Sequence, residues 1–159
     1  RLDPSKCELS AWLHDISKET PGYMLLKIAK KKKIKLDEID YLNPHVLHAR
    51  VGAELVKEKF KVRNPDVLAG IRCHTLAEPN MSKIAMVVYL ADSTEPGRAK
   101  EFASPVRKVL KDQGLEKAVL RAIDTKLISV VKSGRRIHPL TINARNWLIG
   151  SIKNKTSKK

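Results

Sequence analysis

The chain has 159 residues, 42% hydrophobic and 31% charged, which is enough for one domain with its own core and too polar for a membrane protein. The formal net charge of +15 implies attraction to polyanions such as nucleic acids, nucleotides or phosphorylated small molecules, although 4% aromatic residues provide few stacking platforms for single strands. Two cysteines, Cys7 and Cys73, are too few for a disulfide framework, and without an apolar leader they suggest a cytoplasmic protein with free thiols.

The expected helices follow one another along the chain with recognisable starts and faces. In five places a residue that commonly caps a helix precedes proline, which is favoured at the first helical position: Asp3-Pro4, Thr20-Pro21, Asn43-Pro44, Asn64-Pro65 and Ser104-Pro105. Apolar residues three and four positions apart then outline buried faces: Leu9, Trp12, Leu13 and Ile16; Leu47, Val51 and Leu55; Val67, Leu68 and Ile71; Ile84, Val87, Val88 and Ala91.

Two longer helices are expected over residues 115–131, ending near Gly134, and over residues 141–149, ending at Gly150. No segment alternates with the period of a strand. The sequence therefore predicts an all-α protein, a bundle of about seven to nine helices in a single domain over residues 1–150. Residues 151–159 are expected to form a basic, flexible tail, and the lysines of residues 30–35 a solvated surface.

The apolar run 84–91 leads into Asp92, which still lies on the helical face of that run. A carboxylate removed from water is costly unless a cation or strong donors meet it. Asp92 could cap a helix or pair with an arginine, or it could meet a metal ion.

Three histidines support the last of these alternatives. His14 directly precedes Asp15, and His48 and His74 lie at or beside the predicted buried faces of their helices. A lone histidine in such a place is more often a hydrogen-bonded core residue than a ligand. Imidazoles and carboxylates from four helices, however, form a mixed nitrogen and oxygen ligand set, which suits iron, manganese or zinc.

Two cationic residues flank these candidate ligands. Lys18 lies one helical turn after His14, and Arg98 follows a Pro-Gly turn beyond Asp92. An ammonium and a guanidinium beside a metal can hold phosphate oxygens, which is the arrangement that phosphoryl transfer requires.

Four stretches extend this pattern into a resemblance: WLHDISKE (12–19), HARVGAELV (48–56), IRCHTLAEPNMSKIAMVVYLADSTEPGR (71–98) and HPLTINARNWLI (138–149). They resemble the bacterial YqeK-type symmetrical diadenosine tetraphosphate hydrolases, which belong to the HD superfamily of metal-dependent phosphohydrolases. The doublet His14-Asp15 is the one that names the superfamily. The resemblance covers roughly residues 8–150.

The resemblance implies a helical bundle around a dinuclear metal centre, often of iron, with manganese or another divalent ion as the alternative. It implies that the metal ligands are His14, Asp15, His48, His74 and Asp92, with Asp15 bridging the two ions. A hydroxide between the ions would then attack diadenosine tetraphosphate and release two ADP.

The resemblance also implies substrate contacts. Lys18, Thr75 and Arg98 match positions that hold phosphate oxygens, so that Asp15, Lys18 and Arg98 form the expected catalytic set. Ser82 and Arg145 match substrate positions less closely. The family has one more histidine ligand on a helix upstream of the doublet, and none of the thirteen residues before His14 is histidine. We therefore expect this chain to lack that N-terminal helix.

Two other functions remain open at this stage. One is an HD-type phosphatase that acts on simpler nucleotides. The other is a basic, non-catalytic RNA- or ribosome-binding module, for which the charge of +15 is the argument. The favoured partner is a nucleotide substrate, and nucleic acid is possible but not favoured. No membrane partner is expected. The sequence leaves the oligomeric state open.

Overall fold

The computed structural model describes residues 2–156, which form nine α-helices and one 3-10 helix without a strand. In chain order they are α1 (Pro4–Leu13), α2 (Gly22–Lys31), α3 (Glu38–Leu42), η1 (Pro44–Leu47), α4 (His48–Lys59), α5 (Pro65–Cys73), α6 (Lys83–Ser93), α7 (Lys100–Gln113), α8 (Leu115–Lys132) and α9 (Pro139–Thr156). The predicted all-α class and number of helices are confirmed. None of the described helices has the length and apolar character needed to cross a membrane.

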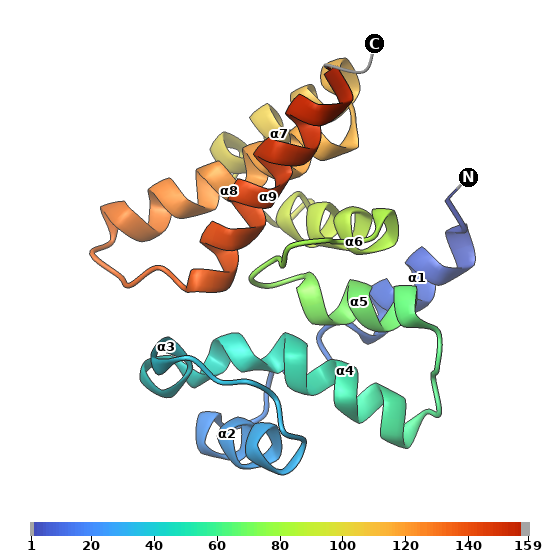
Figure 1. Ribbon diagram of the computed structural model, residues 1–159, viewed down its shortest axis with the longest axis vertical. Coiled ribbons are helices and arrows are strands. Elements are labelled where there is room, and N and C mark those ends of the chain that lie inside the picture. Colours follow the sequence, from blue (N-terminus) through green and yellow to red (C-terminus); the bar gives the residue numbers. More distant parts are fainter. Residues whose placement is uncertain (1, 157–159) are drawn as a thin grey trace.

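Helix α6 lies in the middle of the molecule, with α1 to α5 on one side and α7 to α9 on the other (Figure 1). The largest apolar cluster joins α6 to α7, α8 and α9, and its fully buried side chains include Tyr89, Ile123 and Leu148. A smaller cluster holds α2 against α4 through Leu25 and Val51. A third cluster joins α4 to α5. The loops and helix ends between these clusters carry the candidate site.

Helix α1 packs on α5 through small residues, and this reverses the expected face of α1. Ser10 is fully buried, and a Cβ atom on Gly70 would lie only 2.8 Å from its hydroxyl oxygen. The prediction that Leu9, Trp12 and Ile16 form the buried face is wrong, because they are 41%, 80% and 40% exposed. Close approach of two backbones through serine and glycine leaves no room for the larger side chains on that face.

Two of the five predicted caps form as expected. Asp3 accepts a hydrogen bond from Ser5 N at 3.0 Å, and Asn64 accepts from Asp66 N at 3.0 Å. In contrast, the start predicted at Ser104-Pro105 is wrong, since α7 begins at Lys100 and contains Pro105. Burial of Ala103 and Val106 on either side of this proline stabilises the helix, which offsets the hydrogen bond that proline cannot donate.

The end predicted for the last helix at Gly150 is also wrong. Helix α9 continues through this glycine to Thr156, so that residues 151–156 of the expected tail are helical, while residues 157–159 lie outside the described residues. A helical glycine costs only about 1 kcal/mol relative to alanine. Ile149 and Ile152, on either side of it, are half-buried, and this burial of apolar surface opposes that cost.

Candidate functional site

Three histidines from different parts of the chain aim the same ring nitrogen at one point. His14 follows α1, His48 begins α4 and His74 follows α5. Each Nδ1 lies against the carbonyl oxygen three residues earlier: Ala11 at 2.6 Å, His45 at 2.6 Å and Ile71 at 2.7 Å. Because a carbonyl can only accept, Nδ1 carries the proton and Nε2 keeps a free lone pair. This outer hydrogen bond is the usual way in which a metal-binding histidine is oriented.

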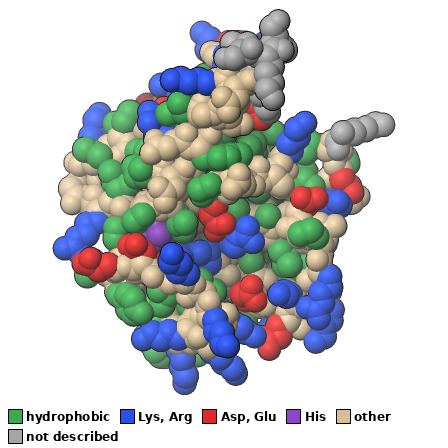
Figure 2. All heavy atoms as spheres, viewed as in Figure 1, with side chains coloured by type: hydrophobic (Ala, Val, Ile, Leu, Met, Phe, Trp, Pro, Cys, Tyr) green, Lys and Arg blue, Asp and Glu red, His purple; other side chains and the backbone are tan. Residues whose placement is uncertain are grey.

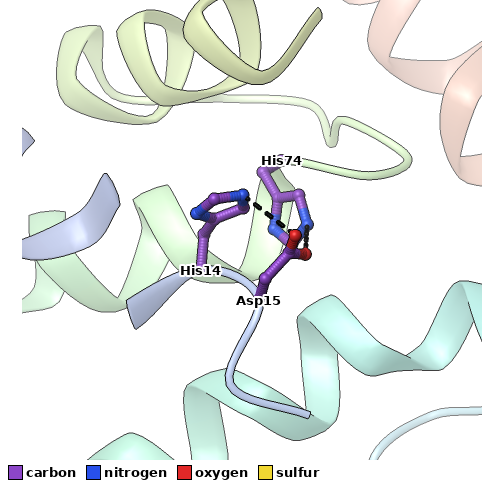
Figure 3. Close-up of side chains that lie close together, drawn as sticks. All are labelled: His14, Asp15 and His74. Carbon is purple, nitrogen blue, oxygen red and sulfur yellow. Dashed lines mark ion pairs between the residues drawn. The ribbon is translucent and has the colours of Figure 1, made fainter. Parts of the chain in front are cut away.

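The carboxylate of Asp15 lies beside the rings of His14 and His74 (Figure 3), and His48 is its third histidine neighbour. Its Oδ1 is 3.4 Å from His74 Nε2 and 3.6 Å from His48 Nε2, and its Oδ2 is 3.4 Å from His14 Nε2. Oδ1 is buried and accepts no hydrogen bond among the described residues, and His48 Nε2 and His74 Nε2 face each other at 3.0 Å. Two imidazole nitrogens and a carboxylate oxygen thus converge where the Thr75 hydroxyl is 3.0 Å from both nitrogens, and a metal ion would stabilise this arrangement.

Asp92 is at the edge of this cluster. Its Oδ1 lies 3.9 Å from His14 Nε2 and accepts a hydrogen bond from Arg98 Nη2 at 2.8 Å. Arg98 Nε also donates to the carbonyl oxygen of Asp92 at 3.0 Å. The positive group expected beside Asp92 is therefore Arg98, and a metal ion at His14 would be a second one.

The donor set fits a divalent cation. Ligand atoms of His14, Asp15 and His74 all lie within 4.8 Å of one another, and His48 and Asp92 adjoin them. Imidazole nitrogens and carboxylate oxygens suit iron, manganese or zinc better than thiophilic ions. The structure brings the five predicted ligands together, and metal binding by them remains a prediction.

The charges around Asp15 favour its ionised form. The nearby His74 ring and the Lys18 ammonium, which donates to Asp15 Oδ2 at 2.6 Å, hold the pKa of the Asp15 carboxyl well below its usual range. The same hydrogen bond raises the pKa of Lys18. Burial lowers the pKa of His48, so its Nε2 stays free of a proton at neutral pH. These protonation states are the ones that metal binding needs.

The loop after α5 is held by a lysine that no sequence motif indicates. The Thr75 hydroxyl lies 3.0 Å from both His48 Nε2 and His74 Nε2, and the Thr75 carbonyl oxygen accepts a hydrogen bond from Lys126 Nζ at 2.6 Å. The Lys126 ammonium lies 5.3 Å from the centre of the Tyr89 ring, and burial lowers the pKa of this lysine. Nothing in the sequence of α8 distinguishes Lys126 from its exposed lysines, because only the tertiary fold buries it.

The other predicted substrate residues are placed differently. The Ser82 hydroxyl caps α6 by accepting a hydrogen bond from Ala85 N at 3.2 Å. Arg145 pairs with Asp124 of α8 at 2.5 Å. Thr75 and Arg98, in contrast, line a cavity that adjoins the histidine cluster.

This cavity has a volume of about 450 Å³ and lies between the α5–α6 loop, the start of α7, α8 and the α8–α9 loop. Apolar side chains form part of its wall, among them Leu76, Phe102 and Ile137, while other wall residues are cationic: Arg98, Lys126, Arg135 and Arg136. A volume of this size is typical of small-molecule sites. Apolar walls with several cations suit a molecule that has both a flat ring system and phosphates.

The fold and the histidine–aspartate cluster define a class of hydrolase, and comparison with known families agrees. Residues 1–97 match the HD domain family. The crystal structure of an HD superfamily hydrolase from Clostridium acetobutylicum, described as involved in NAD metabolism, superposes with a TM-score of 0.87 and 34% identity, over 94% of this chain and 78% of that one. The chain belongs to the HD domain family.

Within the HD domain family, the chain is similar to proteins whose names give a more specific activity. The symmetrical bis(5'-nucleosyl)-tetraphosphatase of Bacillus subtilis is 34% identical over 147 residues, which are 92% of this chain and 78% of that protein. A probable nicotinate-nucleotide adenylyltransferase/Ap4A hydrolase of Mycoplasma genitalium is 35% identical over 101 residues, which are 64% of this chain and 28% of that protein. The predicted membership of this enzyme family is confirmed.

Proposed function

We propose that the chain hydrolyses diadenosine tetraphosphate symmetrically to two ADP, with metal ions held by the five predicted ligands. The observation that carries the proposal is the convergence of three histidine Nε2 atoms on the Asp15 carboxylate, two of them on its orphaned Oδ1, in a chain 34% identical to a symmetrical bis(5'-nucleosyl)-tetraphosphatase. Bound divalent ions would neutralise phosphate charge and activate a water molecule at neutral pH. The two oxygens of Asp15 face different histidines, so Asp15 would hold metal ions together with His14 and His74.

The residues of the chain would orient the tetraphosphate. The Lys18 ammonium and the Arg98 guanidinium are 52% and 42% exposed on either side of Asp15 and Asp92, so phosphate oxygens can reach both. The Thr75 hydroxyl can donate to a third oxygen. Fixed donors around a transferred phosphoryl group supply most of the catalysis in reactions of this kind, because charge stabilisation and positioning dominate.

The cavity beside Thr75 would hold one nucleoside half of the substrate. Its apolar wall can take an adenine ring, and the cations along the α8–α9 loop can meet the phosphates that lead to the metal centre. Lys126 of α8, another cation of the cavity wall, also fixes the Thr75 loop.

Replacing Lys126 by methionine is expected to lower kcat/KM for diadenosine tetraphosphate roughly ten- to a hundredfold, since a hydrogen bond to a charged group contributes about 1.5–3 kcal/mol. The loss should be mainly in KM if the ammonium binds phosphate, and mainly in kcat if it only positions Thr75. The exposed Lys117 of the same helix, replaced by methionine, is the matched control. Equal kinetics for both variants would contradict a role for Lys126.

Product analysis tests the proposed function directly. The chain is loaded in parallel with iron, manganese or zinc, and the products of diadenosine tetraphosphate are resolved by chromatography. ADP as the single product supports the proposal. ATP together with AMP would mean asymmetric cleavage, and phosphate release from mononucleotides without turnover of the dinucleotide would favour an HD-type phosphatase for simpler nucleotides. Either result would overturn the proposal.

A further inference from the structure

Exposed cations gather at one end of the molecule, away from the histidine cluster. Figure 2 shows Lys and Arg side chains along the lower part of the view, where Figure 1 places α2 and α4. We define the α2–α4 basic surface by its exposed members: Lys27, Lys30, Lys31, Lys33, Lys35, Lys57, Lys59, Lys61 and Arg63. The ranges 27–35 and 57–63 contain one acidic residue, Glu58. One or two lysines at a helix C-terminus are enough to interact favourably with the helix dipole. The number of cations on this surface is much larger than that.

The two lysine-rich segments form one continuous surface. Helix α2 packs against α4 through Leu25 and Val51, and Lys32 Nζ reaches Glu58 Oε2 at 2.6 Å. Lys32 lowers the pKa of Glu58 most, and Lys31 and Lys61, which come from the two different segments, lower it further. The cations of both segments therefore act on the same region of space, and a polyanion at this surface would meet them together.

Aromatic rings lie among these cations. Tyr41 is 50% exposed, with Lys30 Nζ 5.3 Å from the centre of its ring, and Phe60 is 54% exposed between Lys59 and Lys61. Cations that follow a phosphate backbone, together with exposed rings on which bases stack, are the combination that binds single-stranded nucleic acid. An anionic membrane fits less well, because Leu25 and Ala29 of α2 are buried in the cluster with α4, which leaves Tyr23 and Met24 as the exposed large apolar side chains of this helix.

We propose that the α2–α4 basic surface binds single-stranded nucleic acid. This site is distinct from the metal centre, because His48 and Lys59 are at opposite ends of α4 and about 16 Å of helix separates them. The binding function goes beyond the proposed hydrolysis and does not depend on it.

Fluorescence anisotropy with a labelled 20-nucleotide uridine RNA tests the proposal, at salt concentrations from 50 to 200 mM. Replacing Lys31, Lys35 and Lys59 together by glutamine should weaken binding at least tenfold, and should reduce the slope of log affinity against log salt by about 2, at roughly 0.7 for each lost phosphate contact. In the charge-matched control, glutamine replaces Lys108, Lys111 and Lys117, which are exposed on α7 and α8. This variant should bind the RNA like the parent chain.

Two further variants separate this site from its alternatives. Phe60→Ala should weaken single-strand binding at least fivefold and leave duplex binding unchanged, because a lost stacking partner affects only unpaired bases. Asp15→Asn should bind the RNA like the parent chain, so that failure of the hydrolase and failure of this site are distinguishable. Equal losses in the two lysine triples, no effect of Phe60→Ala, or binding only to vesicles that contain anionic lipid would each overturn the proposal.

Discussion

Asp15→Asn is expected to abolish metal-dependent hydrolysis, with kcat falling on the order of a thousandfold or more, about 4 kcal/mol of transition-state stabilisation. The Asp15 carboxylate faces His14, His48 and His74, and it lies within 3.6 Å of all three Nε2 atoms. Asparagine has nearly the same shape but lacks the charge, and its amide group presents a donor where a metal ion needs an acceptor. Calorimetric titration with Mn²⁺ should show that the affinity falls together with turnover.

The matched control for this substitution is Asp124→Asn. The Asp124 side chain has the same exposure as Asp15, 31%, and also pairs with a basic residue, but it lies between α8 and α9. This control should keep both metal affinity and kcat, and circular dichroism should show the same helical content for both variants. Retention of metal and turnover by Asp15→Asn would contradict the proposed metal centre.

The sequence could predict the helices whose signals are local. Asp3 and Asn64 cap their helices through hydrogen bonds to residues two positions away, and neighbouring residues alone decide such contacts. The face of α1 depended instead on which helix lies against it. Because α5 presents Gly70 there, Ser10 is buried and Trp12 is exposed, and no spacing within α1 contains that information.

The candidate site likewise has a part that the sequence could predict and a part that it could not. The motif around His14 and Asp15 and the positions of His48 and His74 could be read from the sequence, since each histidine sits at a helix end with its Nδ1 fixed by a carbonyl three residues before. Lys126 could not be predicted, because it reaches Thr75 across 51 positions of the chain. The residues that line the cavity come from many segments, so no periodic pattern within a single segment indicates it.

His138 illustrates a contact that the sequence only hinted at. It occurs in one of the motifs, but its partner, Asp40, precedes it by 98 residues. His138 Nδ1 accepts the backbone N–H of Leu140 at 3.1 Å, so Nε2 carries the proton and donates to Asp40 Oδ1 at 3.2 Å. The guanidinium of Arg50 donates to the same oxygen. These groups connect α3, α4 and the start of α9 beneath the wall of the cavity, to which His138 belongs.

Asp40→Ala is therefore expected to lower the free energy of unfolding by about 3–5 kcal/mol, the range found when one partner of a buried ion pair is removed. The Asp40 side chain is fully buried and that of Arg50 is 8% exposed, so the variant would leave Arg50 Nη2 and the His138 N–H without an acceptor away from water, while Arg50 Nη1 keeps its hydrogen bond to the Lys35 carbonyl oxygen. Urea denaturation followed by circular dichroism measures this loss, with the slope m unchanged if the unfolded state is not altered.

Two comparisons identify the cause of that loss. Asp124→Ala breaks a half-exposed ion pair and should cost no more than about 1 kcal/mol. The double variant Asp40→Leu with Arg50→Met removes both charges and should recover part of the stability, because no ionised group is then left buried without a partner. If Asp40→Ala and Asp124→Ala were equally stable, the buried network would not be holding α3 and α4 to the start of α9. A loss that the double variant does not reduce would mean that the backbone N–H of Asp37, which Asp40 also accepts at 2.8 Å, is the more important contact.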